Sequence, residues 1–392
     1  MAKRFALVGL GLLACFSFDE ATAQSTANLN GQVNTITTAV PFLRISPDAR
    51  SGAMGDVGIA ISADANAQYW NVAKIPFTEK KYGVSLTYTP WLKDLVPDIW
   101  LGYISGFAKF GPENNQAVSA SLRYFNLGDI NYTDVNAQPI GTGKPREFSF
   151  DIGYSRRLSP YLSTGLSLRY IHSAIAAGVS STANYKPGNA FAADLGVFYS
   201  KTNELDGGRA NTLALGAILS NVGSKISYNT LRRDFIPINL GLGAAYTSQF
   251  DEYNKVTFAL DLNKLLVPSP QFDTAGNQYY PTDKSVVSGM FGSFGDAPGG
   301  FGEEMREFQI SAGIEYWYQN QFAVRAGYFY EDKTKGDRKY FTCGIGVRYN
   351  VFNINVAYLV PSGSGINRNP LSNTLRFSLM FELDKLEGSG GE

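Results

Sequence analysis

The sequence predicts an all-β fold, a transmembrane β-barrel of about 14 antiparallel strands, and three observations lead to it. From residue 81 onward, segments of roughly ten residues alternate apolar positions with small or polar ones. After residue 23, no uninterrupted apolar stretch approaches the roughly 18 residues that a membrane helix needs. Short and long connections alternate between the segments, as in bacterial outer-membrane barrels. A backbone crosses lipid only as helices or as a closed barrel, so this pattern favours a barrel over the alternative, a soluble β-sandwich.

The alternation is clearest in the segment 147–156. Phe148, Phe150, Ile152 and Tyr154 occupy one face of it, and small or charged residues occupy the other. We expect the apolar face of each strand to contact lipid and the small or polar face to line the lumen. The same pattern places strand cores at 81–88, 99–110, 116–125, 147–156, 161–172, 190–200, 211–221, 237–247, 255–263, 307–317, 321–330, 340–349, 352–360 and 373–381.

The connections between these segments predict the orientation of the barrel. Short ones are expected at 111–115, 157–160, 318–320 and around Asn350, and long ones at 126–146, 173–189, 222–236 and 264–306. In such barrels the short turns face the periplasm and the long loops face outward. An even number of strands then places both chain ends in the periplasm, and the protein in the outer membrane of a Gram-negative bacterium.

The N-terminus has the layout of a secretory signal peptide. Two basic residues precede an apolar run over 5–18, and Ala21, Thr22 and Ala23 form a small-residue cleavage site before Gln24. We therefore expect residues 1–23 to be a signal peptide. A lipoprotein cleavage site ending in Cys15 is the alternative.

The next segment differs from the rest of the chain. Residues 24–80 lack strand alternation and are rich in proline and glycine, whereas 81–392 carry the barrel pattern. A large barrel needs material in its lumen, so we expect residues 24–80 to form an N-terminal plug or hatch segment on the periplasmic side.

The composition argues against several other function classes. Lys plus Arg and Asp plus Glu each number 34, so the chain has no basic surplus for nucleic acid. His172 is the only histidine, and neither a Ser-His-Asp triad nor a histidine-rich metal site is easily built around one imidazole. An enzyme that acts on lipid is a further alternative, but no nucleophile, base and orienting group occupy plausible positions. We expect no catalytic residues, no metal site and no cofactor.

The longest connection, 264–306, is unusually aromatic for a loop. Exposed aromatic side chains on a glycine-rich backbone are typical of surfaces that bind protein partners. We expect this loop to contact a translocon or a cargo domain; the alternative is that it only folds over the mouth of the barrel. Its candidate partner-binding residues are Phe272, Tyr279, Tyr280, Met290, Phe291, Phe294 and Phe301.

Two stretches of the N-terminal segment carry a family resemblance. Residues 63–73 (ADANAQYWNVA) are similar to the hatch of the FadL-like outer-membrane family, in which an Asp-Ala-x-Ala-aromatic run precedes Asn-Pro-Ala. This chain has Val72 where that family usually has proline. Residues 42–56 (FLRISPDARSGAMGD) resemble PorV proteins, the FadL-like barrels of the type IX secretion system, as do 88–92 and the long loop after residue 263. The resemblance makes Asp64, Tyr69, Trp70 and Asn71 the candidate hatch residues.

The resemblance implies a cargo shuttle without enzymatic activity. Such a protein receives cargo bearing a C-terminal signal domain from the type IX translocon, and delivers it to a surface attachment complex of the PorU type. Its other expected partner is outer-membrane lipid. The broader FadL-like family implies a rival function, the uptake of hydrophobic small molecules through the hatch.

Overall fold

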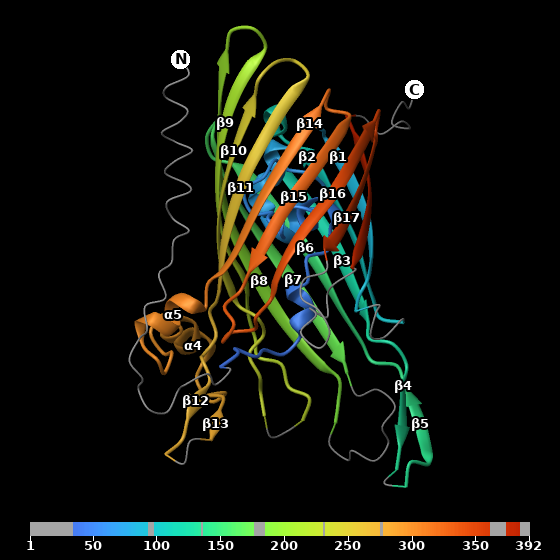
Figure 1. Ribbon diagram of the computed structural model, residues 1–392, viewed down its shortest axis with the longest axis vertical. Coiled ribbons are helices and arrows are strands. Elements are labelled where there is room, and N and C mark those ends of the chain that lie inside the picture. The colour runs from blue at the N-terminus through green and yellow to red at the C-terminus, as the bar shows by residue number, and fades with distance from the viewer. Residues whose placement is uncertain are drawn as a thin grey trace. The chain divides into compact units, whose positions relative to one another are not determined.

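Fourteen strands form a closed antiparallel barrel in the described part of the chain (Figure 1). The computed structural model describes residues 34–92, 98–134, 136–175, 185–229, 232–274, 277–360 and 374–384, so the expected signal peptide lies outside the described residues. The barrel strands are β1 (Tyr82–Pro90), β2 (Trp100–Phe110), β3 (Gln116–Asn126), β6 (Arg146–Arg157), β7 (Leu162–Ala174), β8 (Gly188–Leu205), β9 (Arg209–Gly223), β10 (Asn239–Gln249), β11 (Asn254–Leu265), β14 (Gln309–Tyr318), β15 (Phe322–Tyr330), β16 (Lys339–Tyr349), β17 (Phe352–Val360) and β18 (Leu375–Leu383). Each corresponds to one expected strand core, so the predicted fold class is confirmed.

The first and last strands close the barrel. β1 pairs with β18 in an antiparallel register that runs from Tyr82 opposite Leu383 to Tyr88 opposite Phe377. Sequence neighbours pair around the rest of the wall, and the register shifts only within the β8–β9 pair, near Asp194. There Asn221 adopts a φ of 59° and its backbone N–H donates to Asp194 Oδ1 at 2.7 Å. Asparagine tolerates this left-handed conformation better than most residues.

The two faces of the wall differ as the alternation predicts. Along β6, Phe150 and Ile152 are 47% and 50% exposed on the outer face, while Ser149 and Asp151 are buried on the inner face. An apolar outer belt around a polar inner face is the pattern of a barrel embedded in lipid. No helix within the described ranges is both long and apolar enough to cross a membrane.

The two ends of the barrel differ in their connections. At the turn end, strands are joined by short links such as 250–253 between β10 and β11 and 350–351 between β16 and β17. At the loop end, longer connections carry extra elements, which Figure 1 shows below the wall. These are the hairpin β4 (Ile130–Thr133) and β5 (Pro139–Gly143), and, between β11 and β14, β12 (Gln271–Phe272), β13 (Gln278–Tyr279), α4 (Val286–Gly292) and α5 (Phe301–Arg306).

A segment that precedes β1 lies inside the ring of strands (Figure 1). We call residues 40–78 the lumenal segment; it contains η2 (Pro41–Arg44), α2 (Ala49–Gly52), α3 (Ala67–Trp70) and η3 (Val72–Phe77). Its apolar side chains pack against small inward residues of the wall. At Gly327 a Cβ atom would lie 2.0 Å from the backbone carbon of Met54, so glycine at this position lets the two backbones touch.

Candidate functional site

The lumenal segment spans the barrel from the loop end to the turn end. Just before it, Asn34 N–H donates to the Thr334 carbonyl in the β15–β16 loop at 2.9 Å. At its other end, the Pro76 carbonyl accepts from Arg157 Nη2 at 2.8 Å, and the Thr78 carbonyl accepts from Lys109 Nζ at 2.6 Å. The first described residue therefore lies at the loop end, opposite the end at which β1 begins.

A buried ion-pair cluster fixes the middle of this segment to the wall. Arg50 contacts Glu315 through two hydrogen bonds, Nη2 to Oε1 at 2.8 Å and Nε to Oε2 at 2.9 Å. Glu315 also accepts from Arg325 Nε at 2.7 Å, and Arg50 pairs with Asp64 at 3.0 Å. These side chains are 12% exposed or less. We call Arg50, Asp64, Glu315 and Arg325 the central clamp.

Helix α2 aims Arg50 at the wall. Asp48 precedes the helix and accepts from Ser51 N–H at 2.8 Å, which caps the helix N-terminus. The second oxygen of Asp48 accepts from Trp70 Nε1 at 2.6 Å, which ties α2 to α3. Both carboxylate oxygens of Asp48 are therefore hydrogen-bonded, and they fix the start of the helix that carries Arg50.

Other buried contacts surround the central clamp. Arg376 of β18 pairs with Asp56 at 2.7 Å, and Asp56 also accepts from the Tyr340 hydroxyl at 2.7 Å. Asp261 of β11 accepts the backbone N–H groups of Gly58 and Ile59 at 2.7 and 2.9 Å. The lumenal segment is thus held from several sides of the wall.

The four expected hatch residues all lie in the lumenal segment, but they do not meet at one point. Asp64 belongs to the central clamp, and Trp70 contacts Asp48. The Tyr69 ring faces the guanidinium of Arg123 at 4.4 Å, and Asn71 Nδ2 donates to the Val197 carbonyl at 3.0 Å. Sequence reasoning missed Arg50, Glu315 and Arg325, although a charged residue on an inward strand face was the available signal for the last two.

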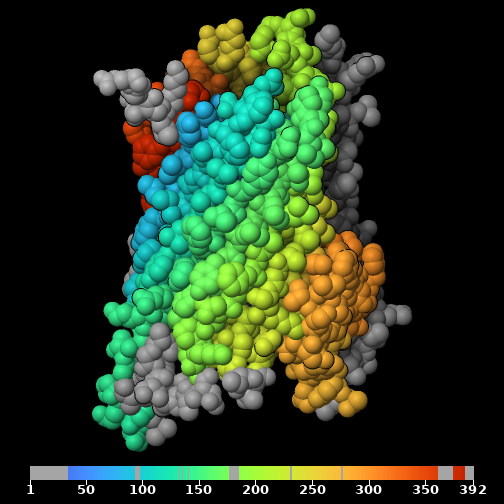
Figure 2. Space-filling model, turned by 180° about the vertical axis from the view of Figure 1, so that it is seen from behind, coloured from blue at the N-terminus to red at the C-terminus, as the bar shows by residue number. Residues whose placement is uncertain are grey.

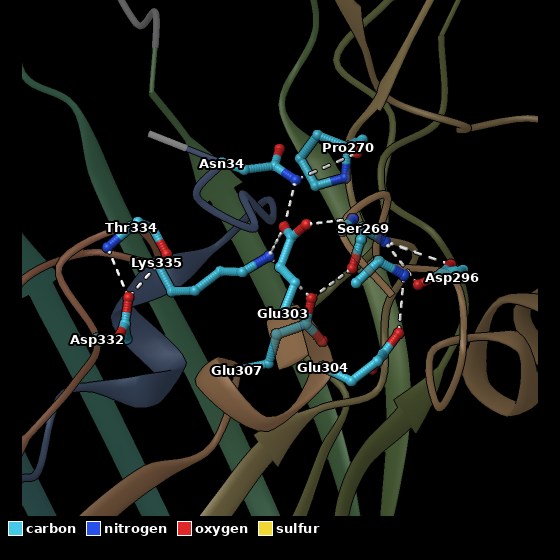
Figure 3. A network of polar contacts seen from close by, with 12 residues as sticks. Asn34, Ser269, Pro270, Asp296, Glu303, Glu304, Glu307, Asp332, Thr334 and Lys335 are labelled. Atoms are coloured by element: carbon cyan, nitrogen blue, oxygen red, sulfur yellow. Dashed lines mark hydrogen bonds and ion pairs between the residues drawn. The ribbon is translucent and has the colours of Figure 1, made fainter. Parts of the chain in front are cut away.

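The long loop between β11 and β14 is anchored by a second polar network (Figure 3). Lys264, 2% exposed on its side chain, pairs with Glu304 of α5 at 3.0 Å and with Glu307. Glu307 also accepts from Lys335 Nζ at 3.0 Å and from Ser269 Oγ at 2.7 Å. We call these five residues, with Asn34 and Glu303, the loop-end network.

Asn34 and Glu303 connect this network to the chain that enters the lumen. Asn34 Nδ2 donates to Glu303 Oε1 at 2.7 Å, and Lys335 also contacts Glu303 (Figure 3). Burial alone would raise the pKa of Glu303, but the hydrogen bonds from Lys335 and Asn34 outweigh it and hold the pKa below its ordinary value. Glu303 is therefore ionised at neutral pH and joins α5, the β15–β16 loop and residue 34.

The anchored loop presents an apolar surface on the outside of the molecule. Figure 2 shows this part of the chain, in orange, beside the strands at the loop end. Its exposed apolar side chains, which we call the cap face, are Val287 (61%), Phe291 (68%), Phe294 (50%), Phe301 (81%) and Met305 (53%). Several large exposed apolar side chains on one folded loop are typical of an interaction site.

The other expected loop residues have different positions. Tyr279 is half exposed on β13, and Phe272 is partly buried on β12. Met290 packs against the buried cluster at the loop end, and Tyr280 lines a hollow there. Phe291, Phe294 and Phe301 are therefore exposed on the same loop as Val287 and Met305, whereas Phe272, Tyr280 and Met290 are less exposed and Tyr279 lies on β13.

Replacing Lys335 by methionine should loosen the long loop. The change removes the cation shared by Glu303 and Glu307, and a lost hydrogen bond to a charged group costs about 1.5–3 kcal/mol. We expect chymotrypsin to cut the long loop of the folded barrel about tenfold faster. Lys333→Met is the matched control, because Lys333 is exposed two residues away. Equal cleavage of the two variants would contradict the anchoring role of Lys335.

Two cavities among the described residues differ in size and in position. The polar cavity between the lumenal segment and the wall measures about 90 Å³, and Arg44, Asp56, Arg169 and Asn239 are among its lining residues. This volume holds a few water molecules and no larger ligand. A wider hollow of about 600 Å³ opens at the loop end, against Phe125, Tyr228, Phe235 and Tyr280. We call it the loop-end hollow.

The described residues contain no group of three or more histidine, cysteine, aspartate or glutamate side chains arranged to hold a metal ion. His172 stacks beside Phe148, with ring centroids 5.0 Å apart, and its Nδ1 lies 2.8 Å from Asn189 Oδ1. The imidazole thus makes contacts within the wall at the loop end.

A family comparison matches the larger part of the chain. The model of the family described as "Type IX secretion system protein PorV" matches residues 28–272 of the 392. None of the curated proteins compared with the chain matches its sequence.

Solved structures of two bacterial toluene transporters and of a FadL homologue are similar to this chain. The toluene transporter TodX of P. putida has a TM-score of 0.50 at 12% identity, with 91% of this chain and 100% of that chain covered. The toluene transporter TbuX of Ralstonia pickettii has a TM-score of 0.47 at 10% identity, covering 86% and 98%. A FadL homologue of Pseudomonas aeruginosa has a TM-score of 0.43 at 10% identity, covering 89% and 99%. At these identities the likeness concerns the fold alone.

Proposed function

The chain belongs to the PorV family of type IX secretion system proteins, and from this membership we propose that it is an outer-membrane cargo shuttle. It receives cargo that bears a C-terminal signal domain from the translocon and delivers that cargo to a PorU-type attachment complex. It acts by binding proteins and carries out no catalysis.

The observation that carries this proposal is the filled lumen. The lumenal segment is held by the central clamp, and the cavity beside it, about 90 Å³, has room for water only. In this role residues 24–80 act as a plug and residues 81–392 as the membrane wall. Cargo then meets the outside of the barrel and its loop end, and does not pass through the lumen.

The cap face supports the same role. Phe291, Phe294 and Phe301 are exposed on helices or turns that the loop-end network anchors. Large apolar side chains on a fixed backbone bind partners at little entropic cost. We assign the cap face to the contact with the translocon or with a cargo signal domain.

The proposal also sets the orientation of the barrel. β1 begins and β18 ends at the turn end, which faces the periplasm, and the loops face outward. The cap face then lies on the cell surface, where exported cargo arrives.

Site-specific photo-crosslinking in intact cells tests the function. A photoreactive phenylalanine at position 291 should attach to translocon or cargo proteins, because Phe291 is 68% exposed on the cap face. The same group at Phe250, 53% exposed at the turn end, is the control. Absence of translocon and cargo adducts at position 291, with the barrel correctly inserted, would contradict the proposal.

A second candidate function is transport of hydrophobic small molecules. The loop-end hollow, about 600 Å³ and lined by Phe125, Phe235 and Val267, is of ligand size. Co-purification separates the two functions, since a shuttle brings large proteins with it and a transporter brings small apolar molecules. Lipid-like ligands without protein partners would favour the transporter.

A further inference from the structure

One acidic side chain in the wall of the loop-end hollow is buried without a cation. Glu147 lies near the loop-end start of β6, lines the hollow and is 2% exposed. Its Oε1 accepts a hydrogen bond from Ser173 Oγ at 2.6 Å. Its second carboxylate oxygen accepts from no described residue, and no described lysine or arginine pairs with it. A buried carboxylate is costly unless a positive charge or further hydrogen-bond donors reach it.

The hydrogen bonds behind Glu147 run in one direction. The Tyr228 hydroxyl donates to Ser173 Oγ at 2.8 Å, and Ser173 donates its single hydroxyl proton to Glu147. Glu147 is therefore the final acceptor of this chain, and neither hydroxyl has a proton left for a molecule in the hollow. The polar corner of the hollow offers a hydrogen-bond acceptor, so it favours a ligand that donates.

The basic side chains at the hollow already have partners. Arg232 lines the hollow and pairs with Asp234, with Nε and Oδ1 2.5 Å apart. Lys225 Nζ donates to the backbone carbonyl of Thr282, a lining residue, at 2.8 Å. Of the three charged residues that line the hollow among the described residues, only Glu147 lacks an opposite charge.

The rest of the lining is largely apolar and aromatic. Phe125 of β3 and Phe235 are buried, and they line the hollow together with Tyr228 and Tyr280. A cation is attracted to the face of an aromatic ring. The volume of the hollow, about 600 Å³, is within the range of ligand sites. An apolar body with one positively charged nitrogen fits both the rings and the unpaired carboxylate.

We propose that the loop-end hollow binds small apolar molecules that carry a protonated amine. The ammonium donates to the second oxygen of Glu147, and the apolar body lies against Phe125 and Phe235. A fatty carboxylate would bring a second negative charge to Glu147, and a hydrocarbon would leave that carboxylate buried without a partner. This inference rests on the second candidate function, the binding of small apolar molecules, and adds the charge that the ligand must carry.

Isothermal titration calorimetry with the purified, full-length protein in a non-ionic detergent tests the proposal. The probes are 4-phenylbutylamine, 4-phenyl-1-butanol and 4-phenylbutanoate, which share one apolar body and differ in the charge of the end group. At neutral pH we expect the amine to bind about tenfold tighter than the alcohol, because a hydrogen bond between charged groups is stronger than a neutral one. The carboxylate should bind most weakly.

Three variants locate the effect. Glu147→Gln keeps the shape of the side chain and an acceptor for Ser173 but removes the charge, so the preference for the amine should vanish. Asp129→Asn is the matched control, because Asp129 is an exposed loop-end carboxylate that pairs with Lys144 at 3.3 Å, and it should keep the preference. Thr37→Trp narrows the hollow and should weaken the amine and the alcohol alike.

The possible outcomes separate this proposal from the functions proposed above. Equal binding of the amine and the alcohol overturns it and leaves the hollow a site for neutral apolar molecules, which is the second candidate function. A preference for the amine that survives Glu147→Gln, or binding that Thr37→Trp leaves unchanged, also overturns it, because the amine would then bind elsewhere. Absence of binding by all three probes overturns both. The shuttle function is tested independently, by crosslinking in cells.

Discussion

Glu315→Ala should destabilise the barrel and free the lumenal segment. The change leaves Arg50 and Arg325 buried without their shared carboxylate, and removal of one partner from a buried ion pair costs about 3–5 kcal/mol. Arg50 keeps Asp64 as a charged partner, whereas Arg325 keeps two neutral ones, the Asn355 amide at 2.9 Å and the Trp317 ring 5.3 Å from its guanidinium. The largest penalty therefore falls at the point where the segment meets β14 and β15.

Two measurements check this prediction. Heat-dependent migration on gels should show a lower unfolding temperature for Glu315→Ala than for the native barrel. Planar-bilayer recordings should show openings that the native barrel lacks, because the released segment no longer fills the lumen. Glu204→Ala is the control, since Glu204 is exposed on β8 at the turn end and forms no ion pair with another described residue. If both variants unfolded at the same temperature and stayed closed, the central clamp would not hold the segment.

The wall of the barrel was predictable because its signal is local. Within each strand, successive side chains point to opposite faces. The sequence alone therefore assigns Phe150 and Asp151 to opposite faces of the wall, whichever strands lie beside β6. Antiparallel pairing of sequence neighbours then fixed the order of the strands. Only closure, the pairing of β1 with β18, depended on a contact between distant parts of the chain.

The contacts of the lumenal segment were not predictable in the same way. Arg50 and Glu315 lie 265 positions apart, and no periodicity relates them. The sequence does show charged residues, such as Glu315 and Arg325, on the inward faces of strands. Buried charges of this kind must be paired, because an unpaired buried charge is costly. It does not show which arginine pairs with which carboxylate, because that depends on the fold of residues 48–70.

The long loop between β11 and β14 was also predictable only in part. Its aromatic composition predicted a partner-binding loop, and the structure has two short helices there. The sequence did not predict these helices, because the loop is rich in glycine and glycine disfavours helix. Gly289 nevertheless lies in α4, where a Cβ atom would be 2.8 Å from the Phe235 ring. Met290 was grouped with the exposed aromatics, although its position on α4 turns it toward the buried cluster.

Changing Phe291, Phe294 and Phe301 together to serine should abolish partner binding by the cap face. Truncation of an anchor residue at a protein interface costs about 2 kcal/mol or more, so the triple variant should weaken binding about 100-fold or more even without full additivity. The same side chains are 50–81% exposed in the free barrel, so its stability should change little. Recovery of translocon and cargo with the tagged barrel measures the effect.

A matched variant separates a specific contact from a general loss of apolar surface. Leu205, Phe250 and Tyr253 are 47–53% exposed at the turn end, and their change to serine removes a similar exposed apolar surface from the opposite end of the barrel. We expect that variant to retain its partners. If both triple variants lost partners equally, the effect would come from insertion or solubility. If neither did, the cap face would not be the binding surface, and the loop-end network would anchor a loop that only covers the mouth of the barrel.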